Sequence, residues 1–189
     1  KKKYNWKACK FKNYSSSVQQ FERWIDLTNL ELTIQRNDYS LAEKKNYPLS
    51  NPRIKRLVVK TIELSLEANH LKEFRSFQNT IVIRFSGSDE SKRLNNCYRK
   101  KDYATNVLTF SYGIYPQITA DILICIPVAE MEAKIRKIQL DQHVAHLIVH
   151  GVLHATGYDH RNLTEATEME QLEVDILGKF DISNPYSKI

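Results

Sequence analysis

Apolar side chains alternate with polar ones in several short stretches of the chain. Leu30–Gln35 and Asn79–Phe85 have an apolar residue at every second position, which is the pattern of a strand with one buried face. Val107–Ser111 and Ala120–Pro127 are two further expected strands, and the short loop between them contains a glycine and a proline. Short loops of this kind connect hairpins, so we expect the last two strands to pair antiparallel.

Longer stretches repeat apolar residues at helical spacing and follow capping residues. Asn51 can cap a helix that has Pro52 at its first position, and Thr164 can cap the last helix. The expected helices are Val18–Leu30 (short and amphipathic), Pro52–Ala68, Asp89–Tyr98, Ala129–Lys137, Asp141–Ala155 and Thr164–Leu177. Strands with helices between and after them predict an α+β fold, in which helices cover a single small mixed β-sheet.

The composition limits the class of protein. A chain of 189 residues with 42% hydrophobic content can bury one core, and no internal repeat indicates a second one. No apolar run approaches the roughly 20 residues that cross a bilayer, so no membrane association is expected. The three cysteines are scattered and odd in number, which favours a reducing compartment, and we expect the protein in the cytoplasm.

The net charge of +6 is unevenly distributed along the chain. Residues 1–60 hold 14 Lys and Arg against 5 Asp and Glu, a net charge of +9, whereas residues 61–189 hold 14 against 17, a net charge of −3. This asymmetry fits a polyanionic partner at one end, and a solvated basic tail equally well. We divide the chain into a basic extension, residues 1–29, that suits RNA binding or packing, and a domain, residues 30–189.

Three histidines have the spacing of a metal site. His150 and His154 are four residues apart and share one face of a helix, so both can bind one ion. His146 is eight residues from His154, about 12 Å along a helix, and is too far to share that ion. Gly157 can end the helix and return the chain, which brings in His160 as the third ligand. Three imidazoles with one open position are typical of a catalytic zinc site at the end of a core helix.

The residue after His150 separates this pattern from that of the common zinc proteases. Those helices read H-E-x-x-H, with the glutamate as general base, whereas this chain has Gly151 at that position. A glycine inside a helix costs about 1 kcal/mol relative to alanine, so we expect a close approach of another backbone or a ligand there. The simpler interpretation, histidines that only pack in the core, remains open for a single residue such as His146, and His143 is expected to be solvated.

Two motifs resemble those of the YbeY family of metal-dependent endoribonucleases, which act in ribosomal RNA maturation. The string HGVLHATGYDH, His150–His160, matches every specified position of the family signature H-G-x-L-H-x-x-G-Y-D-H. The string LNNCYRKKDYATNVLTF, Leu94–Phe110, resembles the second motif, with Ala104 for the usual proline and Thr109 for the usual serine. Shorter resemblances are Ala120-Asp121-Ile122, Met169 and Glu173, and together they cover about residues 30–180.

The resemblance implies a single-strand-specific endoribonuclease that acts with the ribosome or its small subunit, in maturation of the 3′ end of small-subunit RNA and in ribosome quality control. It implies one Zn²⁺ per chain, which would activate a water for attack on the phosphodiester. Arg99 falls on the family's functional arginine and would stabilise developing phosphate charge, unless it forms a salt bridge with Asp102 or another carboxylate. Residues expected to support the metal ligands or contact RNA are His146, Asp159, Lys101 and Asp102. His146 is expected to face the same cleft as His150, and Asp159 could equally fix the turn before His160.

Two other functions fit part of the pattern. Three histidines with an open position also suit a zinc hydrolase of peptide or amide bonds, although Gly151 and the basic residues of 92–101 argue against it. A ribosome assembly factor with a purely structural metal is the non-enzymatic alternative. Imidazole ligands favour zinc without excluding nickel, copper or cobalt, and the oligomeric state is open.

Overall fold

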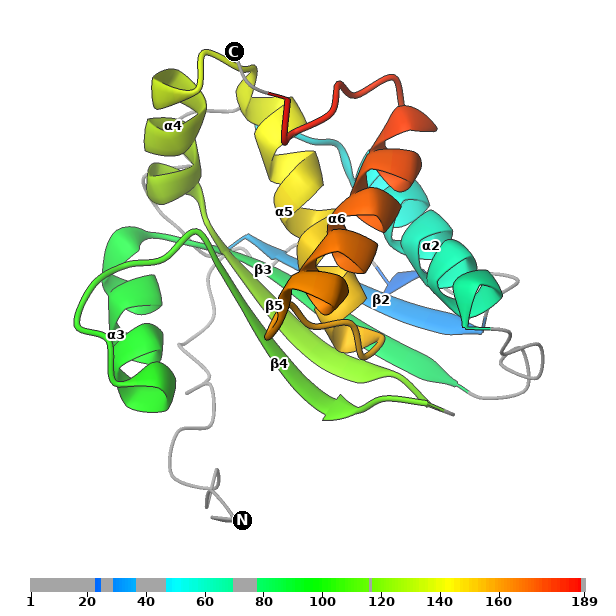
Figure 1. Cartoon of the computed structure of the whole chain (residues 1–189). Coiled ribbons are helices and arrows are strands. Elements are labelled where there is room, and N and C mark those ends of the chain that lie inside the picture. The colour runs from blue at the N-terminus through cyan, green and yellow to red at the C-terminus, as the bar shows by residue number, and fades with distance from the viewer. Residues whose placement is uncertain (1–22, 25–28, 37–46, 70–77, 116, 188–189) are drawn as a thin grey trace.

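Five strands form one mixed sheet in the computed structural model, which describes residues 23–24, 29–36, 47–69, 78–115 and 117–187 (Figure 1). The spatial order of the strands is β1-β2-β3-β5-β4, so β4 lies at one edge. β2, β3 and β5 are parallel, whereas β1 pairs with β2 and β4 pairs with β5 in antiparallel fashion. The strands are β1 Arg23–Trp24, β2 Leu30–Arg36, β3 Asn79–Ser86, β4 Val107–Gly113 and β5 Thr119–Cys125.

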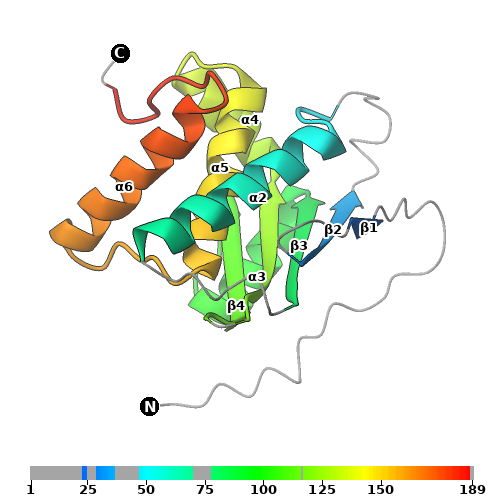
Figure 2. The same cartoon turned by 90° about the vertical axis from the view of Figure 1, so that its right-hand side faces the viewer.

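Helices cover both faces of the sheet unequally, as the two views show (Figures 1 and 2). The helices are α2 Asn51–Ala68, α3 Ser88–Arg99, α4 Ile126–Ile135, α5 Leu140–Ala155 and α6 Leu163–Gly178. α5 lies in the large core with α2 and α6 beside it, and buries nearly all of its side chains from residue 143 onward. α3 lies on the opposite face, where its Leu94 packs against Leu108 and Leu123. The predicted α+β fold with a single mixed sheet is therefore confirmed.

The alternation in β5 shows how the sequence divides the two faces. Ile122 and Ile124 are buried in the large core beneath α5, and Leu123 between them packs under α3. The hairpin between β4 and β5 is antiparallel as predicted, with Val107 opposite Ile124 and Thr109 opposite Ile122. This hairpin places β4 directly against α5, which carries the histidines.

Several predicted element boundaries are wrong, and two of them have a clear chemical reason. Asn162 rather than Thr164 caps α6, because its Oδ1 accepts the N–H of Glu165 at 3.0 Å. Ser50 rather than Asn51 takes the N-cap position of α2. The strand expected over residues 120–127 ends at Cys125, because α4 begins at Ile126 and has Pro127 in its first turn, where a missing N–H has no cost.

The prediction of an amphipathic helix over residues 18–30 is wrong for the part of this segment that the structure describes. Arg23–Trp24 form β1, paired with Thr33 and Leu32, and Leu30 already belongs to β2. The open side of β2 offers backbone hydrogen bonds that apolar spacing alone does not reveal. The rest of that segment, and most of the expected extension, lie outside the described residues. Across the described ranges, every helix is too short or too polar to cross a bilayer.

Candidate metal centre and its cleft

Three histidine side chains converge at the C-terminal end of α5. The Nε2 atoms of His150 and His154 are 3.1 Å apart, as expected for residues one helical turn apart. The ring of His160 lies 5.6 Å from that of His150 and 5.0 Å from that of His154, centroid to centroid. One nitrogen of each ring lies within 4.8 Å of the others, so the three predicted ligands form one group that can hold a metal ion.

A glycine turn brings His160 back to the helix. Gly157 has φ +104°, in the left-handed region that favours glycine, and its N–H donates to the carbonyl of His154 at 3.2 Å. The N–H of Tyr158 donates to the carbonyl of Leu153 at 3.0 Å, which completes a Schellman ending. The turn predicted at Gly157 is therefore present.

Hydrogen bonds to the far side of two imidazoles fix their tautomers. His154 Nδ1 lies 3.0 Å from the carbonyl oxygen of Tyr158, which can only accept, so Nδ1–H is the donor. His150 Nδ1 donates to Glu173 Oε1 at 2.8 Å. Both Nε2 atoms therefore keep a lone pair, and both lone pairs face the group centre.

This arrangement fits a divalent metal ion. Two nitrogens bound at about 2.0–2.1 Å to one tetrahedral ion lie about 3.3–3.4 Å apart, close to the 3.1 Å between the Nε2 atoms of His150 and His154. Burial, followed by the charge of His150, lowers the pKa of His154 to about 4, so its imidazole is neutral at neutral pH. A divalent ion between the two Nε2 atoms would be bound by both rings.

Glu173 of α6 is the carboxylate that supports the centre. It is completely buried, and its Oε2 accepts from His146 Nε2 at 2.7 Å and from the hydroxyl of Tyr186. Burial by itself would raise the pKa of Glu173, but hydrogen bonds from His146 and His150 bring it down to about 2. The ionised carboxylate therefore acts only as an acceptor and orients His150.

Sequence reasoning used Glu173 only as part of a motif and did not assign it to the site. The signal was nevertheless present in α6, where Met169, Glu173, Ile176 and Leu177 form one buried stripe. A carboxylate in an apolar stripe is almost never fully buried without partners, so it predicts a hydrogen-bonded group opposite it.

Gly151 allows α5 to pack closely on the β4–β5 hairpin. A Cβ atom at this position would lie 2.7 Å from Ile122 Cγ2 and 3.2 Å from Thr109 Oγ1. The hydroxyl of Thr109 donates to the Gly151 carbonyl at 3.3 Å. A close approach at Gly151 is therefore present, but side chains of the sheet make it, and not another backbone or a ligand as expected.

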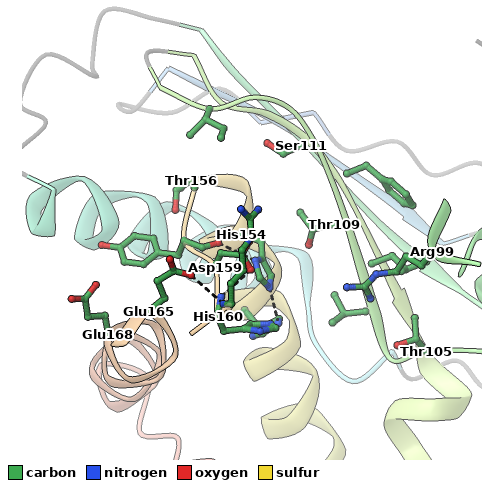
Figure 3. A pocket seen from close by; sticks show the side chains of 18 of the residues that line it. Arg99, Thr105, Thr109, Ser111, His154, Thr156, Asp159, His160, Glu165 and Glu168 are labelled. Carbon is green, nitrogen blue, oxygen red and sulfur yellow. Dashed lines mark hydrogen bonds and ion pairs between the residues drawn. The ribbon is translucent and has the colours of Figure 1, made fainter. Parts of the chain in front are cut away.

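A cleft of about 1050 Å³ lies between the histidines and the wall formed by β4 and the end of α3. Figure 3 shows Arg99 extending toward the histidines from the opposite side, with Thr109 on the strand between them. Arg99 is exposed, and among the described residues none forms an ion pair or hydrogen bond with its guanidinium. The possible salt bridge between Arg99 and Asp102 is absent, and Asp102 pairs instead with Lys92 at 3.4 Å.

The other expected site residues are not all in the cleft. Asp159 lines it but fixes the turn, since its Oδ1 accepts the N–H of His160 at 2.8 Å and its Oδ2 pairs with Arg161 at 2.6 Å. That backbone hydrogen bond lowers the pKa of Asp159 most. Lys101 and Asp102 are exposed and do not line the cleft.

His146 and His143 lie in a second cavity of about 480 Å³ on the other side of His150. His146 was expected to face the main cleft; instead it is 9% exposed and bonded to Glu173. The expectation that His143 is solvated is wrong. It is 3% exposed, and its Nε2–H donates to Glu132 Oε2 at 2.7 Å.

Comparisons with known proteins give a consistent result. The family model described as "Endoribonuclease YbeY" matches residues 40–181. An "Endoribonuclease YbeY" of Polaromonas sp. strain JS666 is 37% identical over 163 residues, which are 86% of this chain and 97% of that protein. A relative of the same name from Burkholderia pseudomallei strain 1710b is 55% identical over 108 residues, 56% of this chain. The chain spans 59% of the length of that relative.

Among solved structures, the solution structure of TM1509 from Thermotoga maritima is similar to this chain. The two share 18% sequence identity and superpose with a TM-score of 0.48, over 83% of this chain and 99% of that one.

Proposed function

This chain belongs to the YbeY family, and from that premise we propose that it is a metal-dependent endoribonuclease specific for single-stranded RNA. The proposed substrate is ribosomal RNA, at the 3′ end of the small-subunit molecule and in ribosome quality control, in the cytoplasm. The observation that carries the proposal is the convergence of His150, His154 and His160 across one cleft from Arg99. We propose residues 30–189 as the catalytic domain.

The three histidines would hold one divalent ion, which we propose to be zinc because all three donors are imidazole nitrogens. When bound, the ion supplies Lewis-acid polarisation of the phosphate and activation of a water. Glu173 and the Tyr158 carbonyl hold the imidazoles of His150 and His154 in the tautomer that leaves Nε2 available.

Arg99 is the proposed catalytic side chain. Attack on phosphorus builds negative charge on the non-bridging oxygens, and a planar guanidinium can donate to two of them at once. Arg99 is suited to this because it lines the cleft and has no partner among the described residues that would have to be displaced. Its position at the end of α3 adds to a basic region, since residues 92–102 hold five cations and one carboxylate, a net charge of +4.

A peptide or amide hydrolase has weaker support. The general base of the common zinc proteases would occupy position 151, where a side chain of any size would meet Ile122. The carboxylate near the centre, Glu173, is fully buried behind His150 and does not line the cleft, so it is not available to a substrate.

The proposal is tested by purifying wild type, Arg99→Ala, Arg99→Lys and His154→Ala, measuring bound metal, and assaying each on labelled single-stranded RNA. Wild type is expected to hold about one metal ion and cut RNA. Arg99→Ala is expected to keep its metal and lose about 100-fold or more in kcat, whereas Arg99→Lys retains part of the rate because it keeps the charge. His154→Ala is expected to lose metal and activity together. Equal rates for Arg99→Ala and wild type would contradict the proposal.

A further inference from the structure

One wall of the cleft is an open sheet edge. β4 is the last strand of the sheet, and all residues from Thr105 to Ser111 line the cleft. Edge strands present a row of backbone N–H and C=O groups that have no partner within the sheet. The groups on the open side of β4 therefore face the same space as the histidines and Arg99.

The hydrogen-bond pattern shows which backbone groups point outward. The N–H of Cys125 donates to the carbonyl of Asn106 at 2.8 Å, so residue 106 faces β5. In an antiparallel pair, inward and outward residues alternate, so residues 108 and 110 also face β5 and residues 107, 109 and 111 face the open edge. The Val107 N–H is already bound by the side-chain oxygen of Asn106 at 2.7 Å. Within the described ranges, the N–H groups of Thr109 and Ser111 remain available.

We infer that this edge binds the sugar-phosphate backbone of single-stranded RNA, with the Thr109 and Ser111 N–H groups donating to successive phosphates beside the scissile one. The inference rests on the proposed function and adds the residues that hold the flanking nucleotides. The outward carbonyl of Thr109 can accept from a 2′-hydroxyl, which RNA has and DNA lacks.

The spacing of the edge suits a nucleic-acid strand. Outward groups on an antiparallel strand repeat about every 6.8 Å, twice the rise of about 3.4 Å per residue. Neighbouring phosphates of one strand lie at a similar separation, because the sugar-phosphate backbone runs obliquely to the direction in which the bases stack. Successive outward N–H groups can therefore donate to successive phosphates.

The charged and aromatic residues that line the cleft also suit an RNA strand along β4. Arg99 lies on the β4 side of the cleft, while Glu165 and Glu168 line the opposite end, as Figure 3 shows. Phosphates are therefore favoured along β4. Tyr115 also lines the cleft and is 44% exposed, so its ring can stack on a base.

The test uses the metal-loaded full chain and a short fluorescent single-stranded RNA, with KM and kcat measured separately. Ser111→Pro removes the outward N–H at an edge position that tolerates proline, and Ser111→Ala is its reference because both lack the hydroxyl. We expect the KM of Ser111→Pro to be about tenfold above that of Ser111→Ala, with little change in kcat or bound metal. Neutralising one flanking phosphate as a methylphosphonate should raise the wild-type KM by a similar factor, and should have little further effect in Ser111→Pro.

Equal KM values for the two folded variants would overturn the inference. If Ser111→Pro does not fold, the KM of wild type is measured on RNAs with one methylphosphonate at each flanking position. An unchanged KM for every one of these RNAs would overturn the inference. If the protein cuts RNA but shows none of these KM effects, the proposed endoribonuclease function stands and only the edge-binding inference fails. If metal-loaded wild type cuts no RNA, both the proposed function and the inference fail. Cleavage of an unstructured peptide that Ser111→Pro abolishes would assign the edge to a peptide and contradict RNA binding.

Discussion

The carboxylate of Glu173 lies 2.8 Å from His150 Nδ1, and it is completely buried between α5 and α6. The orientation of a proposed metal ligand therefore depends on the packing of a second helix, 23 residues away in sequence. Tyr186 and His146 donate to the other oxygen of the same carboxylate. A metal ion bound by His150 would consequently be coupled to the docking of the C-terminal segment through one side chain.

Replacing Glu173 with Gln should weaken metal binding by about 10–100-fold, because an amide of the same shape loses the charge that fixes His150. Competition with a chromophoric chelator measures the affinity. Glu170→Gln on the exposed side of the same helix is the control, and we expect its metal affinity to match that of wild type. Unchanged affinity in Glu173→Gln would show that the carboxylate has no influence on the centre.

Gly151→Ala should destabilise the protein by about 1–3 kcal/mol, even though alanine favours a helix by about 1 kcal/mol. The added Cβ would lie 2.7 Å from Ile122 Cγ2, which is part of the core and has little room to move. Gly178→Ala is the matched control, since no atom lies within 4 Å of the Cβ it would add. Urea denaturation compares the two, and equal stabilities would contradict the close packing of α5 on the hairpin.

Stability should fall as the pH is lowered below about 6.5, and His143 should contribute to this fall. Burial lowers the pKa of His143, although its hydrogen bond to Glu132 opposes this, while His146 and Arg136 add to the lowering. Above pH 6.5 both folded and unfolded chains hold a neutral imidazole. Below it the unfolded chain binds a proton that the folded chain does not, so the folded state loses relative stability until the lowered pKa is reached.

The variant His143→Gln should therefore lose less stability between pH 6.5 and 5.5 than wild type, by at most about 1.4 kcal/mol. Urea denaturation of both proteins at the two pH values, with the same metal content, measures the difference. Identical losses would mean that His143 is as accessible to protons in the folded chain as in the unfolded one.

The metal centre was predictable where it depends on local spacing. His150 and His154 are fixed by helical geometry, and the return of His160 follows from a glycine that can adopt positive φ. Glu173 was not assigned because its stripe on α6 indicates that it is buried and bonded, but the identity of its partners depends on how α6 docks on α5. The same holds for the burial of His143, which requires Glu132 from α4.

The fold, too, was predictable where it depends on local sequence patterns and not where it depends on tertiary contacts. The strand–helix pattern predicted an α+β sheet, and the hairpin predicted the antiparallel pairing of β4 and β5. The order of the strands was not predictable from spacing, and neither was the short strand β1, which forms only because β2 offers an open edge. The cap of α6 was misplaced because nearby polar residues are equivalent as caps until a hydrogen bond selects one, here that of Asn162. At α2 the N-cap Ser50 makes no side-chain cap hydrogen bond, so nothing in the capping chemistry distinguishes it from Asn51.

The most direct test of the central claim is the RNA cleavage rate of metal-stripped protein as zinc is returned in known equivalents. The account predicts that the rate rises in proportion to bound metal and reaches a plateau at about one ion per chain. It also predicts that His154→Ala gives no such rise over the same range. A cleavage rate that does not depend on bound metal, or that persists in His154→Ala, would contradict it.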